Sequence, residues 1–69
     1  MDYVAKPLDN TLEAFQNIED AISDIRSQKN VMTNQTMISD YDEILTCLEK
    51  ASDDLINAIV IFRKHEGSL

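Results

Sequence analysis

The fold is decided by residues 41–62, YDEILTCLEKASDDLINAIVIF. Apolar or small residues recur there with alternating spacings of four and three: Tyr41, Leu45, Leu48, Ser52, Leu55, Ile59 and Phe62. This spacing places about one residue per turn along a single stripe of an α-helix. Ile44, Ala51 and Ala58 follow one flank of the stripe. The stretch therefore predicts a long amphipathic helix, which we place over residues 37–66.

Both ends of this helix carry sequence signals. Ser39 is a good capping residue, and the carboxylates of Asp40, Asp42 and Glu43 follow it, where they would meet the positive end of the helix dipole. We therefore expect the helix to begin near Thr36 or Ser39. Its last turn is basic, and a glycine follows at position 67, which is typical of a helix C-terminus.

A second set of apolar residues with helical spacing predicts a shorter helix over residues 7–29. Its stripe consists of Leu8, Phe15, Ile18, Ile22 and Ile25, with Ala14 and Ala21 beside it. Pro7 suits a first helical position, whereas Asn10 and Glu13 have the spacing of a capping pair and offer a later start. We prefer the earlier start because Leu8 belongs to the stripe. Asn30, after a basic last turn, is a plausible left-handed stop.

Residues 30–36 are rich in Asn, Thr and Gln and are expected to form a polar loop between the helices. The sequence thus predicts an all-α fold, an antiparallel two-helix hairpin forming one domain over residues 1–69, with a lead at 1–6 and a tail at 67–69. The alanines beside both stripes would let the two backbones approach closely. Since two helices bury only their facing stripes, we expect self-association into a bundle, or a partner, to complete the fold.

Composition and charge limit the classes of function. The chain has 69 residues, of which 43% are hydrophobic and none is Trp, so its core is thin and aliphatic. A net charge of −7 argues against direct binding to nucleic acid or to anionic membranes. A single cysteine excludes an internal disulfide and suits a reducing compartment. The longest apolar run, residues 58–62, is far shorter than the ~20 residues of a membrane span, so we expect a cytoplasmic protein without a membrane span or targeting segment.

Candidate catalytic and metal-binding groups are few. His65 is the single histidine and has a structural role available at the negative end of the helix dipole. Asp40, Asp42 and Glu43 are similar to part of a calcium loop, but the glycine and the spaced glutamate of that motif are missing. A hairpin of this size offers no concave pocket for a general acid and base. We therefore expect no enzyme activity, catalytic residue, metal or cofactor, and we expect Cys47 to be a small buried or interface residue.

The candidate site is an apolar surface on the second helix. Val60 and Ile61 point roughly 120° to 140° away from the stripe, so a monomeric hairpin leaves them in water. Ile56 widens the stripe toward Val60, and exposed contiguous apolar surface is typical of protein-binding sites. We predict a helix-in-groove contact with another, helical protein. The predicted partner-binding residues are Leu48, Leu55, Ile56, Ile59, Val60, Ile61 and Phe62.

Residues 48–62, LEKASDDLINAIVIF, resemble the second helix of the small co-chaperones for type III secretion needle subunits, which are helical hairpins of similar length. This resemblance implies a cytoplasmic protein that binds a helical-repeat chaperone and helps to keep a needle subunit from polymerising. It also implies that Leu48, Leu55, Ile59 and Phe62 face the chaperone.

Two other functions stay open at the level of the sequence. The carboxylates could imitate DNA phosphates and block a nucleic-acid-binding protein, in which case affinity falls steeply with salt. Alternatively, the chain could be a purely structural subunit of a homo-oligomer, which sedimentation over a range of concentrations would reveal.

Overall fold

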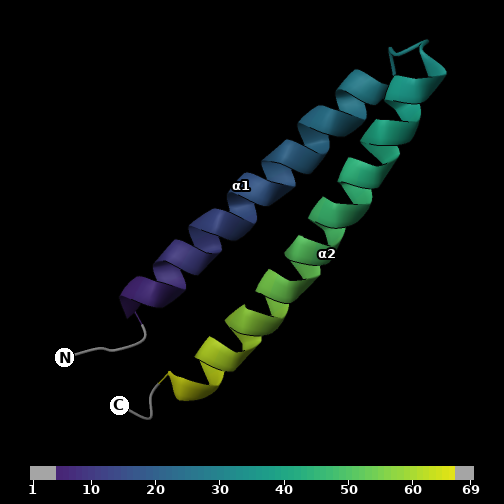
Figure 1. The fold of residues 1–69 in the computed structure, drawn as a ribbon. Helices are drawn as coiled ribbons and strands as arrows, with labels where there is room; N and C mark the ends of the chain where they lie inside the picture. The colour runs from purple at the N-terminus through teal and green to yellow at the C-terminus, as the bar shows by residue number, and fades with distance from the viewer. Residues whose placement is uncertain (1–4, 67–69) are drawn as a thin grey trace.

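The computed structural model describes residues 5–66, which form two antiparallel helices, α1 (Ala5–Lys29) and α2 (Gln35–His65). The helices lie side by side along their length, and α1 begins at the same end of the hairpin at which α2 ends (Figure 1). The fold is therefore the all-α helical hairpin that the two heptad stripes predict. The expected stop at Gly67 lies outside the described residues.

Helix α1 begins at Ala5, two residues before the predicted start, so part of the expected lead belongs to the helix. Pro7 is its third residue, and the first four N–H groups of a helix have no partner within it, so the missing N–H of Pro7 removes no hydrogen bond. The hydroxyl of Thr11 donates to the Pro7 carbonyl over 2.8 Å. Asn10 and Glu13 lie inside the helix and do not cap it.

Helix α2 begins at Gln35, earlier than the predicted start near Thr36 or Ser39. Its cap is Asn34, whose extended backbone (φ −79°, ψ 117°) lets the side-chain oxygen accept a hydrogen bond from the Met37 N–H over 3.0 Å. The carboxylates that follow Ser39 thus lie beyond the first turn. Because Asn34 caps the helix and α2 already begins at Gln35, the polar loop between the helices is confined to residues 30–34.

Replacing Asn34 with Ala is expected to destabilise the hairpin by about 1 kcal/mol, because the Met37 N–H loses its acceptor. The melting temperature should fall by roughly 4–8 °C, as followed by circular dichroism. Asn34→Asp keeps the acceptor and should melt close to the unmodified chain. A larger loss from Ser39→Ala than from Asn34→Ala would contradict this assignment of the cap.

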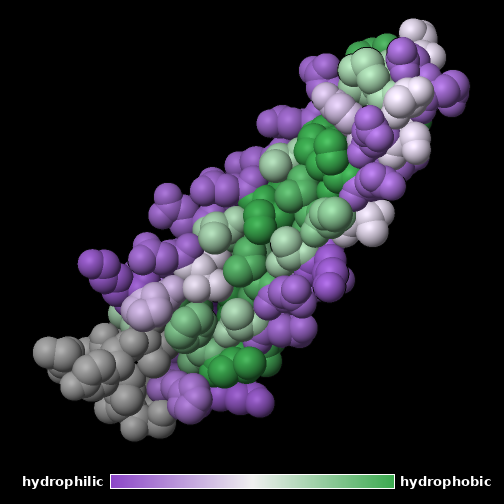
Figure 2. All heavy atoms as spheres, viewed as in Figure 1, coloured by the Kyte–Doolittle hydropathy of each residue, from purple (hydrophilic) through white to green (hydrophobic). Residues whose placement is uncertain are grey.

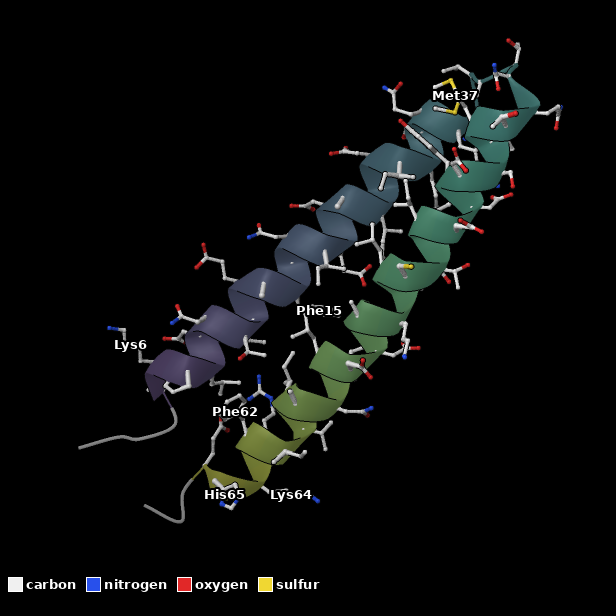
Figure 3. All side chains as sticks on the ribbon, viewed as in Figure 1. Lys6, Phe15, Met37, Phe62, Lys64 and His65 are labelled. Carbon is white, nitrogen blue, oxygen red and sulfur yellow. The ribbon has the colours of Figure 1, made fainter. Side chains whose placement is uncertain are left out.

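The core is a single layer between the two helices. Leu8, Ile22, Leu45 and Ser52 are its buried residues, and the rest of both stripes is half-buried. Phe15 of α1 and Phe62 of α2 lie between the helices (Figure 3). The accessible surface is 5186 Å², whereas a compact protein of this mass has about 4,400 Å². The hairpin, 53 Å long, thus exposes more surface than a globular domain of equal size.

Candidate protein-binding surfaces

Large aliphatic side chains are exposed near the C-terminal end of α2. The exposed fractions are 43% for Ile56, 52% for Val60 and 56% for Ile61. At 3.6 residues per turn, Val60 lies one turn beyond Ile56 on the same side of α2, while Ile61 lies on the side that faces away from α1. These side chains cover the outer part of α2 over about two turns.

The seven predicted partner-binding residues do not share one surface. Leu48, Leu55, Ile59 and Phe62 belong to the stripe that packs against α1, and all four are half-buried. Ile56, Val60 and Ile61 are the exposed members of the set. A partner that contacts Ile56, Val60 and Ile61 therefore binds a helix that is already packed on α1 through the four half-buried residues.

One side of the hairpin, here called the charged side, carries polar contacts between the helices. The buried Ser52 hydroxyl donates to Glu19 Oε1 over 2.6 Å. Arg26 Nη2 pairs with Glu49 Oε1 at 3.2 Å, and Lys29 pairs with Asp42. A groove of about 260 Å³ lies on this side. Its lining consists of Glu19, Arg26, Glu49 and Ser52 together with Ile22, Asp53 and Ile56. These contacts fix the register of α1 against α2.

The opposite side of the hairpin is apolar, and we call it the alanine face. It consists of Ala14, Ile18, Ala21 and Ile25 on α1 and of Ile44, Leu48, Ala51, Leu55, Ala58 and Phe62 on α2. Of these residues, Ile44 is exposed and the others are half-buried. Figure 2 shows the face as a green band that runs along the hairpin between purple edges. The alanines line an open surface at the edges of the helix–helix contact.

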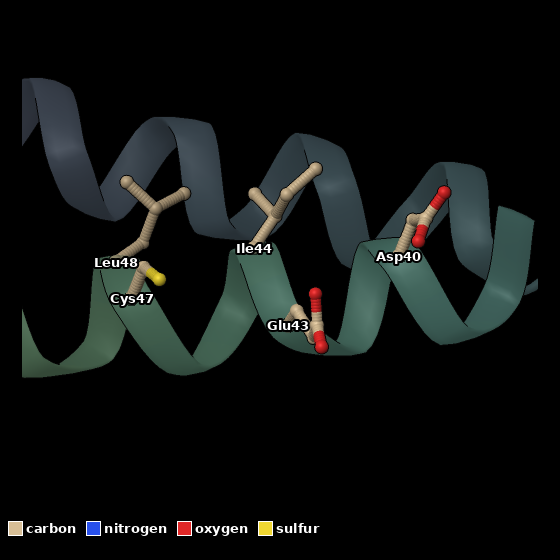
Figure 4. A pocket seen from close by; sticks show the side chains of 5 residues that line it. All are labelled: Asp40, Glu43, Ile44, Cys47 and Leu48. Atoms are coloured by element: carbon tan, nitrogen blue, oxygen red, sulfur yellow. The ribbon is translucent and has the colours of Figure 1, made fainter.

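A shallow groove of about 490 Å³ borders the alanine face near the loop end (Figure 4). Ile44 and Leu48 form its apolar wall, and Asp40 and Glu43 lie at its edge. The Cys47 thiol, expected from the sequence to be buried or in an interface, is exposed beside them. The groove therefore combines an apolar wall with an acidic edge.

The opposite end of the hairpin is basic: Lys6, Lys64 and His65 lie there (Figure 3). Within residues 5–66, no three His, Cys, Asp or Glu side chains are placed to hold a metal ion. Over the same range, neither helix has an apolar stretch that could cross a membrane.

Comparison of the chain with protein-family models, with curated proteins and with solved structures finds no match. The proposals below therefore depend on the geometry and chemistry of the hairpin itself.

Sequence reasoning missed the alanine face as a surface. The signal was present, because Ala14, Ala21, Ala51 and Ala58 each lie beside a stripe at heptad spacing. What the sequence lacks is the rotation of each helix about its axis. That rotation places the alanine flanks of both helices on the same side of the hairpin.

Proposed function

We propose that the chain is a small acidic protein-binding module without enzymatic activity, an adaptor or co-chaperone that docks the C-terminal part of α2 on a helical partner. The observation that carries this proposal is the exposure of Ile56, Val60 and Ile61, each with about half of its surface in water. Burying a fully exposed aliphatic side chain contributes about 1.5–3 kcal/mol, so covering the exposed half of each of these three contributes about half of that, and together they form the apolar part of a helix-in-groove contact.

The surroundings of these anchors support docking. Leu55, Ile59 and Phe62 pack α2 onto α1, so the helix is ordered before a partner arrives, which lowers the entropic cost of binding. Asp53 and Lys64 are exposed near the aliphatic patch and provide a polar rim. A groove lined by helices fits this combination of an apolar ridge and a charged border.

The resemblance of residues 48–62 to the needle-subunit co-chaperones narrows this proposal. It implies a helical-repeat chaperone as the partner and the cytoplasm as the location. In the hairpin, the exposed Ile56, Val60 and Ile61 supply the accessible apolar surface of that segment. Leu48, Leu55, Ile59 and Phe62 would then contact the chaperone through the parts of their side chains that α1 leaves uncovered.

The test is the double variant Val60→Asp with Ile61→Asp. A partner is first captured from the host with the tagged full chain and purified, and its affinity is then measured for each variant. We expect the double variant to keep its helical circular dichroism and to bind at least about tenfold more weakly, a loss of about 1.4 kcal/mol or more.

Val31→Asp is the matched control, because Val31 is the most exposed large aliphatic residue among residues 5–66 and lies in the loop. This variant should bind like the unmodified chain. The affinity of an apolar docking contact should also change little between low and moderate salt, whereas a DNA mimic would show a steep loss. Unchanged binding by the folded double variant would refute the proposed site.

A further inference from the structure

We propose that the alanine face is covered by a second copy of this chain, so that two hairpins form an antiparallel four-helix bundle. The two-fold axis would run parallel to the long axis of the hairpins and place α1 of one copy across from α2 of the other. Ile56 and Val60 lie outside the alanine face and remain accessible in the dimer, so docking through these two residues is compatible with it. Leu48, Leu55 and Phe62 lie within the face, so a second copy would compete with a chaperone that contacts those three.

The first argument is that the apolar surface of each helix is wider than the stripe that packs on the other helix. On α2, Ile44, Ala51 and Ala58 widen it to one side, and Leu48, Leu55 and Phe62 of the packed stripe, each half-buried, share that side with them. On α1, Ala14 and Ala21 widen it beside the half-buried Ile18 and Ile25. A helix in a two-helix hairpin needs only one stripe, whereas a helix in a four-helix bundle contacts two neighbours. Small residues on the widened side permit the close approach of another helix.

The second argument is the available area. The face extends about 27 Å along α2, from Ile44 to Phe62, and about 16 Å along α1, from Ala14 to Ile25, and each helix is about 10 Å wide. The face thus presents on the order of 430 Å² per copy, and a symmetric pair would bury about 900 Å². That total lies just below the roughly 1,000 Å² of a specific interface and is the size of a weak dimer interface.

The third argument is the chemistry of the two rims of the face. The Glu19–Ser52 and Lys29–Asp42 contacts fix the register, and this register places Gln28 level with Glu43 and Asn17 level with Asp54. The α1 rim carries these two amides and, one heptad after Asn17, the carboxylate of Asp24, whereas the α2 rim carries Glu43 and Asp54.

With the two-fold axis parallel to the hairpins, Gln28 and Asn17 of each copy meet Glu43 and Asp54 of the other, and their amide N–H groups can donate to these carboxylates, while Asp24 meets Cys47. A perpendicular axis in the interface would instead bring the α2 helices together and oppose carboxylates to carboxylates. The charge distribution therefore selects the parallel axis.

Sedimentation of the full chain, from micromolar to submillimolar concentration, tests the assembly. We expect a species of twice the 7.8 kDa chain mass. Ala51→Glu buries a charge in the interface and should raise the dissociation constant of the dimer by at least about tenfold. Val60→Asp lies on the other side and should leave it unchanged. A monomer throughout the concentration series, or a dimer insensitive to Ala51→Glu, would overturn the proposal.

Thiol crosslinking tests the arrangement of the two copies. The register places Asp24 level with Cys47, but the two residues lie on opposite outer edges of one hairpin, so a short bismaleimide can join them only between copies. Asp24→Cys should therefore give a covalent dimer, whereas Ser23→Cys, which lies on the charged side, should not. Crosslinking of the unmodified chain through its two Cys47 thiols would overturn the parallel axis.

Discussion

Replacing Ile22 with Ala is expected to destabilise the hairpin by about 2–4 kcal/mol, the largest effect that we expect from a single substitution. Ile22 is the least exposed core residue, with 4% of its surface in water, and it lies in the C-terminal half of α1. A chain of this length has roughly 3–10 kcal/mol of stability in total. Within residues 5–66 the core is one layer between two helices, so that part of the chain contains no third element that could close the cavity. Urea denaturation followed by circular dichroism measures the loss.

Val31→Ala is the control for the Ile22 substitution. Val31 has 78% of its surface exposed, so its truncation should change the unfolding free energy by less than about 0.5 kcal/mol. If Ile22→Ala lowered the unfolding free energy no more than Val31→Ala does, the packing between α1 and α2 would not be the source of stability.

Removal of the Ser52 hydroxyl is expected to give the second largest effect, a loss of about 1.5–3 kcal/mol in Ser52→Ala. Ser52 is 5% exposed, and its 2.6 Å bond to Glu19 has the short length of a hydroxyl donating to a carboxylate. Without this donor, the partly buried Glu19 carboxylate loses its hydrogen bond across the helices. Thermal unfolding followed by circular dichroism gives the stability of each variant.

A double-mutant cycle separates this bond from the packing of Ser52. The variants are Ser52→Ala, Glu19→Ala and their combination, and we expect a coupling energy of about 1 kcal/mol or more. Glu19→Gln keeps an acceptor without the charge and should fall between the unmodified chain and Glu19→Ala. Additive effects within about 0.3 kcal/mol would mean that the bond contributes nothing to the folded state.

The two helices and their pairing could be predicted because a heptad stripe depends only on residue spacing. The start of α2 could not, since the carboxylates after Ser39 are a stronger local signal than Asn34. Asn34 became the cap because its backbone is extended and its side chain reaches the Met37 N–H. A capping residue is thus selected by backbone geometry, which composition alone does not contain.

The candidate site was only partly predictable for a similar reason. Helical spacing is enough to place Val60 and Ile61 outside the stripe, and both are exposed. The partner of Ser52 was not predictable, because Glu19 lies 33 residues away in the chain. The same limitation hid the alanine face, which exists only when both helices have their observed rotation.

The shared location of the first residue of α1 and the last residue of α2 determines how the hairpin responds to mechanical force. A pulling force applied between Ala5 and His65 separates the two helices from that end and acts on one helical turn at a time. Leu8 separates from α2 early, while the Lys29–Asp42 pair near the loop separates late. A protein that grips both ends could therefore peel the helices apart with far less force than sliding them past one another would need.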